Sequence, residues 1–234
     1  MSDDEIKIPT RYHVPCAMLL DKSGSMSGAP IAALNKALTD FKSLFEENNA
    51  DNSVIDLCII AFGGDVEIIQ KFAPSNEMDY TKPLEASGGT PMAEAVEVAL
   101  DEITKRKELY KKNATPYYKP WLVCLTDGNS TEGPTYYNSI KQRLLDETNG
   151  NHVTPYGIGV GDGVNYPDLM DFFGENHTFK LLEVNNIGRF KELFQFLKNS
   201  FTVKSQSKGA KPTNMPEAKD SNGQVFLTAA SFND

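Results

Sequence analysis

Residues 14–26 read Val14-Pro15-Cys16-Ala17-Met18-Leu19-Leu20-Asp21-Lys22-Ser23-Gly24-Ser25-Met26. The first seven are apolar, and a continuous apolar run of this length is typical of a strand buried on both faces of a parallel sheet. A helical pattern follows the polar turn, with apolar side chains at spacings of three and four at Ile31, Leu34, Leu38, Phe41 and Phe45. We therefore expect a strand, a tight polar loop and a helix, with the loop at the carboxyl end of the strand.

Strand-like and helix-like segments alternate along the rest of the chain. Further strands are expected at 54–62, 66–72, 121–126, 153–160 and 179–184, and further helices at 91–112, 136–147, 168–173 and 189–201. Gly63-Gly64 predicts a hairpin, which makes 66–72 an antiparallel edge strand. The alternation predicts an α/β fold with a mostly parallel sheet and helices on both faces.

The predicted organisation is one domain over 14–203, with an N-terminal extension at 1–13 and a flexible C-terminal tail at 204–234. Lys, Ser, Gly, Pro and Asn dominate from 204 to 224, which is typical of a flexible segment. The apolar island Val225-Phe226-Leu227 is compatible with a docking segment or an added edge strand, but an unstructured terminus is favoured.

Composition excludes several classes of function. The net charge of −9 argues against a nucleic-acid binder, and the cations at 105–107 and 111–112 are interpreted as the solvated face of a helix. No apolar run has the roughly 18 residues that a membrane span needs. The acidic start, Met1-Ser2-Asp3-Asp4-Glu5, does not resemble a signal peptide, which favours a cytoplasmic location.

The cysteines and histidines do not suggest a metal or disulfide framework. Cys16, Cys58 and Cys124 each fall in an apolar strand-like run, which predicts reduced, buried thiols. The three histidines show no zinc-like spacing with each other or with cysteine.

Three polar segments follow or precede predicted elements at one edge of the sheet. The first loop contains Asp21, Ser23 and Ser25. Thr90 precedes the helix at 91–112, and Asp127 directly follows the strand at 121–126. If these two strands are neighbours, Asp21 and Asp127 emerge side by side. Taken singly, Thr90 is an ordinary helix cap before Pro91, and the others are ordinary turn residues. Together they form a set of oxygen donors of the kind that Mg²⁺ prefers.

The same residues carry a family resemblance. Asp21-x-Ser23-x-Ser25, Thr90 after a glycine pair, and Asp127-Gly128 resemble the metal-ion-dependent adhesion site of von Willebrand factor A (VWA) domains. The resemblance covers about residues 14–201. The segment 117–121, Tyr-Tyr-Lys-Pro-Trp, and the stretch from 105 to 110 are similar to the bacterial tellurium-resistance-associated branch of that family.

The resemblance implies a Rossmann-like, three-layer fold with a six-stranded sheet and a divalent metal at its top. Ser23, Ser25 and Thr90 would coordinate the ion, and Asp21 and Asp127 would act partly through water. The ion would be Mg²⁺, or Mn²⁺ or Ca²⁺. A Glu or Asp of a protein partner would complete its coordination, and the branch implies a stress-response complex with kinase or phosphatase partners.

A metal-dependent phosphoryl-transfer enzyme or phosphatase is the alternative. The position two after Asp21 is Ser23, not a second carboxylate that could serve as acid or base. Neither a P-loop nor a complete dinucleotide fingerprint occurs in the sequence. A structural domain with a vestigial site is disfavoured because all five positions are occupied. We therefore expect a binding module and not an enzyme.

Overall fold

The computed structural model describes residues 6, 10–46, 53–77, 82–161, 163–181, 189, 192, 193, 195–197, 218, 219 and 225–229. The described strands are β1 (Tyr12–Asp21), β2 (Ser53–Gly63), β3 (Asp65–Pro74), β4 (Trp121–Thr126), β5 (Thr154–Val160), β6 (Thr178–Leu181), β7 (Ala218–Lys219) and β8 (Val225–Ala229). The α-helices are α1 (Ala29–Glu46), α2 (Met92–Lys112), α3 (Pro134–Asn149) and α4 (Tyr166–Phe173). Short 3-10 turns lie at Gly24–Met26, Ser75–Glu77 and Glu175–His177. The described residues between 189 and 197 are also helical.

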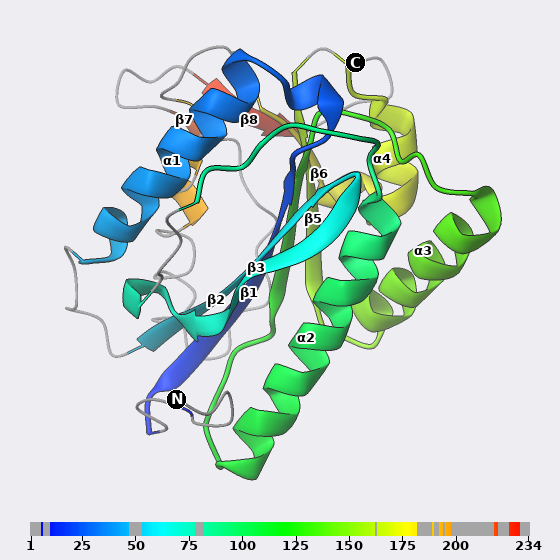
Figure 1. Cartoon of the computed structure of the whole chain (residues 1–234). Helices are drawn as coiled ribbons and strands as arrows, with labels where there is room; N and C mark the ends of the chain where they lie inside the picture. Colours follow the sequence, from blue (N-terminus) through cyan, green and yellow to red (C-terminus); the bar gives the residue numbers. More distant parts are fainter. Residues whose placement is uncertain are drawn as a thin grey trace.

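The strands form one mixed sheet in the order β3-β2-β1-β4-β5-β6-β8-β7. β1, β2, β4, β5 and β6 run parallel, whereas β3 pairs antiparallel with β2 and forms one edge of the described sheet. Figure 1 shows α1 on one face of the sheet and α2, α3 and α4 on the other. The expected α/β fold, including the antiparallel edge strand, is confirmed.

The far edge of the sheet differs from the expectation. The prediction of an unstructured terminus at Val225-Phe226-Leu227 is wrong, because Val225–Ala229 forms β8 and pairs antiparallel with β6 and β7. The described sheet therefore has eight strands rather than six. The physical reason is that β8 covers the open edge of β6 and buries Leu227 completely. Residues 198–217, which include the predicted boundary between the domain and the tail at 204–234, lie outside the described residues, so the domain boundaries stay predictions.

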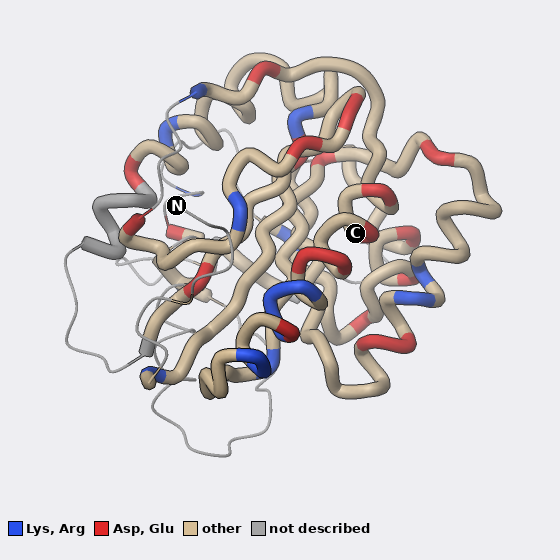
Figure 2. The backbone as a smooth tube through the Cα atoms, turned by 60° about the horizontal axis from the view of Figure 1, so that its bottom comes forward, with Lys and Arg blue, Asp and Glu red and all other residues tan. Residues whose placement is uncertain are grey.

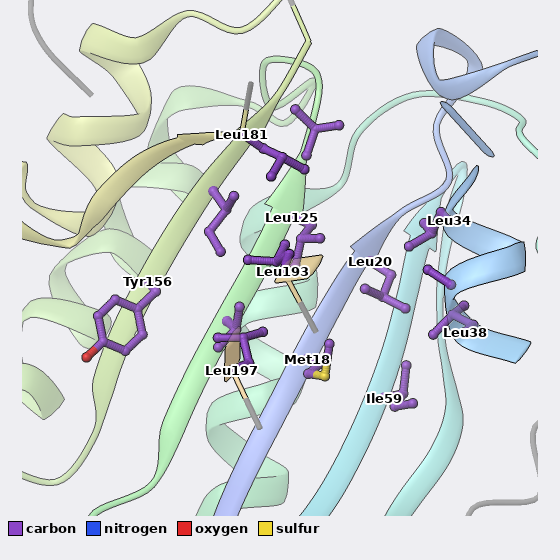
Figure 3. Packing of buried hydrophobic residues seen from close by; sticks show 14 of the residues in the cluster. Met18, Leu20, Leu34, Leu38, Ile59, Leu125, Tyr156, Leu181, Leu193 and Leu197 are labelled. Carbon is purple, nitrogen blue, oxygen red and sulfur yellow. The ribbon is translucent and has the colours of Figure 1, made fainter. Parts of the chain in front are cut away.

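Two apolar layers explain why β1 is apolar without interruption. Met18 faces a layer that contains Leu34 of α1 and Leu193 of the helix near 189–197, as Figure 3 shows. Ala17 faces the opposite layer, which contains Ile103 of α2 and residues of α3 and α4. Because alternate side chains of β1 enter different layers, both must be apolar.

A buried polar cluster holds the carboxyl half of α2 against β1 and β2. Asp56 Oδ2 accepts hydrogen bonds from Arg106 Nη2 at 2.7 Å and from the Tyr110 hydroxyl at 2.5 Å, and it lies 2.8 Å from His13 Nδ1. Burial alone would raise the pKa of Asp56, but the hydrogen bond from His13 and the charge of Arg106 hold it below its usual value. Arg106 is buried, so its expected place on the solvated face of the helix is wrong.

β1 and β4 lie side by side and parallel, with Leu20 opposite Leu125. The chain leaves β1 into α1 on one face, and it enters β4 from α2 on the other face. Asp21 and Asp127 therefore follow neighbouring strands at one edge of the sheet, as expected. This is the crevice in which open α/β sheets bind ligands.

Two smaller expectations from composition concern the cysteines and the membrane. Cys16, Cys58 and Cys124 are free, buried thiols, as expected. Among the described helices, none combines the length and the apolar character needed to cross a membrane.

Candidate metal centre

Asp21 closes β1 and ties the first loop to β4. Its Oδ1 accepts a hydrogen bond from the backbone nitrogen of Ser23 at 2.7 Å, and its Oδ2 accepts one from Thr126 Oγ1 at 2.6 Å. The carboxylate is completely buried, and Thr126 is the last residue of β4. Oδ1 of Asp21 therefore orients the loop that carries the two serines, and Oδ2 joins this end of β1 to β4.

The two serines connect the first loop to the carboxylate after β4. Ser23 Oγ lies 3.0 Å from Ser25 Oγ, and Ser25 Oγ donates to Asp127 Oδ1 at 2.7 Å. Ser23 is buried, Ser25 is exposed and Asp127 is half-buried. The hydroxyls thus form a chain that leads from the interior to the surface and ends at a carboxylate.

Thr90 reaches the same place from a third loop. A side-chain carbon built on Gly128 would lie 3.4 Å from Thr90 Oγ1 and 3.6 Å from Ser25 Oγ. Both hydroxyls therefore border the small space above Gly128, directly after Asp127. The five residues predicted from the sequence come together at one edge of the sheet.

Backbone contacts between loops fix this arrangement. Lys22 N donates to Phe62 O at 2.7 Å, Ser87 N donates to Lys22 O at 2.8 Å, and Gly64 N donates to Gly89 O at 2.8 Å. Gly88 has a positive φ of 70°, and a Cβ there would lie 2.4 Å from the Cα of Gly64. Only glycine allows the two turns to approach so closely.

The amino end of α2 is held by a residue that the sequence did not reveal. The helix begins at Met92 with Pro91 as its N-cap and no side-chain cap, so Thr90 does not have the capping role that it would have if taken singly. Glu132 caps it instead, accepting hydrogen bonds from Ala93 N at 2.6 Å and Glu94 N at 2.7 Å. A carboxylate here also interacts favourably with the helix dipole.

The neighbouring Thr131 ties the loop after Asp127 to the loop of Thr90. Its Oγ1 accepts from Thr90 N at 3.0 Å, and its backbone nitrogen donates to Thr90 O at 3.1 Å. In the sequence, the roles of Thr131 and Glu132 were indicated only by the polar run that follows Asp127, and that run is typical of an ordinary loop.

The electrostatics of the cluster favour a cation. Burial raises the pKa of Asp21, against hydrogen bonds from Ser23 and Thr126 that lower it. Burial also raises the pKa of Asp127, and the nearby charge of Asp21 adds to that effect. Burial disfavours the ionised form of both carboxylates, and Asp21 also disfavours that of Asp127, so a positive ion would relieve this environment.

The donor set fits a hard divalent cation. It combines two carboxylates with three neutral hydroxyls, and all five side chains present oxygen. Across the described ranges, no group of three or more His, Cys, Asp or Glu side chains is placed to hold a metal ion. A metal at this edge would therefore depend on the hydroxyls of Ser23, Ser25 and Thr90 as much as on the carboxylates.

Comparisons with known proteins agree with the fold. The family model of the von Willebrand factor type A domain matches residues 17–196. The chain is 29% identical over 161 residues to inter alpha-trypsin inhibitor heavy chain 4 of Mus musculus, which is 64% of this chain and 16% of that relative. The chain spans 16–18% of the first curated relatives that it matches, so the similarity concerns one part of those longer proteins.

Two solved structures show the same fold. The von Willebrand factor type A protein of Catenulispora acidiphila superimposes with a TM-score of 0.60 at 15% identity, over 86% of this chain and 44% of that chain. The manganese-loaded TRAP protein of Plasmodium vivax gives a TM-score of 0.51 at 18% identity, over 78% of this chain and 73% of that chain. At these identities the likeness concerns the fold.

Proposed function

The chain belongs to the von Willebrand factor type A domain family, and from this premise we propose that it is a divalent-metal-dependent protein-interaction module. The ion would be held by the five converging residues Asp21, Ser23, Ser25, Thr90 and Asp127. The observation that carries the proposal is the hydroxyl chain from Ser23 through Ser25 to Asp127, which opens to solvent at the carboxyl edge of the sheet.

When bound, a divalent cation supplies a Lewis-acidic centre that attracts the carboxylate of a partner's Glu or Asp. The chain's own residues prepare for this in two ways. The hydroxyls of Ser23, Ser25 and Thr90 are neutral donors, so they leave the ion Lewis-acidic. Asp21 and Asp127 together balance the charge of a divalent ion, and Asp21, whose oxygens already accept two hydrogen bonds, also fixes the loop.

We propose Mg²⁺ as the ion, with Mn²⁺ or Ca²⁺ as alternatives. Oxygen donors of this kind bind all three, and hydroxyls together with carboxylates suit Mg²⁺ in particular because it accepts one or two carboxylates with water. The manganese-loaded state of the similar Plasmodium vivax structure supports a divalent ion on this fold.

The partner and its setting are also part of the proposal. We propose a cytoplasmic module of a stress-response complex of the tellurium-resistance type, with a kinase or a phosphatase among its partners. The support is the similarity of residues 105–110 and 117–121 to that branch of the family.

The position of Lys22 argues against a phosphoryl-transfer enzyme. Lys22 is the cation nearest in sequence to Asp21. A phosphoryl-transfer site would need that cation to face a phosphate. Lys22 Nζ is instead engaged with Asp65 Oδ1 at 2.7 Å and Gly63 O at 3.1 Å. A module that binds rather than reacts is therefore proposed.

Calorimetric titration with Mg²⁺ and Mn²⁺ tests the metal site. Ser23→Ala should weaken ion affinity about tenfold or more, whereas Ser27→Ala should not, because the exposed Ser27 hydroxyl donates to Gly24 O in its own turn. Affinity of Ser23→Ala equal to that of the unchanged protein would refute the site. Hydrolysis of a generic phosphoester that requires Mg²⁺ and disappears in Asp21→Ala would replace the binding module by an enzyme.

A further inference from the structure

A groove lies at the other end of α2, away from the proposed metal centre. It has a volume of about 460 Å³ and runs between α2 and the edge strand β3. We call it the α2–β3 groove; its lining residues used below are Lys71, Phe72, Lys105, Arg106, Leu109 and Lys112. Arg106 lies about 21 Å along the helix axis from Met92, at 1.5 Å per residue. A ligand here would not contact the proposed ion.

The groove carries positive charge on both walls, in a chain whose net charge is −9. Lys71 comes from β3, and Lys105, Arg106 and Lys112 come from α2. The charge of Arg106 is already paired with Asp56, so the lysines provide the positive charge that a ligand would meet. Residues 101–112 hold five cations and three acids, and Figure 2 shows basic positions gathered along this part of the molecule. The helix therefore has a local charge opposite to that of the whole protein.

The acids of the groove offset only part of its positive charge. Glu102 and Glu108 line it beside the four cations, and Glu102 is bonded to Lys105 at 2.6 Å. That hydrogen bond raises the pKa of Lys105, while the charge of Lys71 acts in the opposite direction. The two lysines therefore repel each other across the groove, and an anion between them would relieve the repulsion.

The floor of the groove is apolar and rigid. Phe72 and Leu109 are half-buried. The guanidinium of Arg106 lies 5.8 Å from the ring centroid of Phe72 and 5.0 Å from that of Tyr110, and its Nη2 is anchored to Asp56. Its Nε is buried and has no hydrogen-bond partner. A wall fixed in this way loses little conformational entropy when a ligand binds.

The spacing of the side chains indicates the kind of ligand. Lys105, Leu109 and Lys112 occupy positions i, i+4 and i+7 and therefore share one face of α2. The two lysines are about 10 Å apart along the helix, whereas carboxylates two to four residues apart in an extended peptide are about 7–13 Å apart. A single phosphate is too small to bridge that distance.

We propose that the α2–β3 groove binds an acidic, extended segment of a partner protein, with an apolar residue between its carboxylates. The carboxylates would pair with Lys105 and Lys112 on α2 and with Lys71 on β3. The apolar residue would rest on Leu109 and Phe72. This binding needs no metal and goes beyond the proposed function.

Fluorescence anisotropy of the full chain tests this proposal. The probe is a labelled nine-residue peptide with glutamate at positions 1, 5 and 9, leucine at positions 3 and 7 and serine at the others, so that the glutamates and leucines share one face of the extended chain. It is used at low salt and with EDTA present. We expect binding in the presence of EDTA, which the double variant Lys71→Glu, Lys112→Glu weakens about tenfold. The control variant Lys36→Glu, Lys82→Glu makes the same charge change at two exposed positions outside the groove and should bind as the unchanged protein does.

Three results would overturn the proposal. They are no binding of the peptide to the unchanged chain, equal losses in the groove variant and the control variant, and tighter binding of a single-stranded oligonucleotide than of the peptide. A peptide in which serine replaces leucine should bind more weakly, and equal binding would remove the role of Leu109 and Phe72. Because EDTA is present throughout, failure of the metal centre would not affect any of these outcomes.

Discussion

Replacement of Asp56 by alanine should destabilise the fold strongly without altering a residue of the proposed metal centre. Asp56 is completely buried in β2, and one of its oxygens accepts hydrogen bonds from Arg106 and Tyr110 and contacts His13. Without the carboxylate, the buried guanidinium of Arg106 keeps its positive charge and loses its counter-ion. The cost arises from this unpaired charge more than from the lost contacts.

The expected magnitude follows from the burial of both partners. Arg106 is 6% exposed and Asp56 is 0% exposed, so water cannot replace the lost partner. Breaking a buried ion pair in this way costs about 3–5 kcal/mol. For a chain of this size, one kcal/mol corresponds to about 2–4 °C in Tm, so the variant should melt roughly 10 °C lower.

Urea and thermal unfolding measure the effect. The matched control is Asp65→Ala, which removes the ion pair between Lys22 and a carboxylate that is 73% exposed. The control should change stability by less than about 1 kcal/mol, because exposed pairs contribute little. If Asp56→Ala lost no more stability than Asp65→Ala, the account of the buried cluster would be wrong.

The same cluster predicts how stability depends on pH. The folded pKa of Asp56 is lowered from 3.8, with His13 and Arg106 outweighing the effect of burial. The stabilisation is therefore complete above 3.8 and is lost as the pH falls through the lower, folded value. Unfolding of the unchanged protein and of Asp56→Asn from pH 7 to pH 3 should show a difference that narrows below 3.8. A difference that is constant with pH would contradict this.

Three further substitutions test other parts of the structure. Glu132→Ala removes the hydrogen-bond acceptor at the start of α2. The free energy of unfolding, measured by heating, should fall by about 1–2 kcal/mol, and Mn²⁺ binding measured by calorimetry should weaken. If neither quantity changed, the capping role would be excluded. Gly88→Ala places a Cβ against the backbone of Gly64 and should cost about 1–3 kcal/mol in urea unfolding, whereas Gly133→Ala, which meets open space, should cost far less. Leu227→Asp should release β8 and increase amide exchange in β6 without changing ion affinity; protection equal to that of the unchanged protein would mean that β8 does not depend on this side chain.

The parts of the fold with a repeated pattern could be predicted from the sequence. β1 is apolar because its two faces enter different layers, and α2 shows one apolar face over many turns. The glycine pair between β2 and β3 indicated the hairpin. Three short motifs then converged because parallel strands end at the same edge.

Other parts depend on contacts that leave little trace in the sequence. Three apolar residues at 225–227 do not distinguish a strand from a frayed end, since the partner edge of β6 lies more than forty positions earlier in the chain. Arg106 stands in a run of cations and looks solvated until its partner in β2 is known. Asp56 was the feature of the sequence that could have indicated the buried position of Arg106, because a carboxylate inside an apolar strand requires a partner.

The contacts that stabilise the fold and the side chains proposed to bind the ion lie in different parts of the structure. The buried cluster around Asp56 holds α2 at its carboxyl half, while Glu132 holds its amino end beside Thr90. The loop of Ser23 is fixed mainly through backbone atoms, and Ser23→Ala keeps the nitrogen that bonds to Asp21. The hydroxyl can therefore be removed while the loop stays in place. A loss of ion affinity in that variant would then report on the oxygen itself, because the frame that positions it does not depend on the side chain.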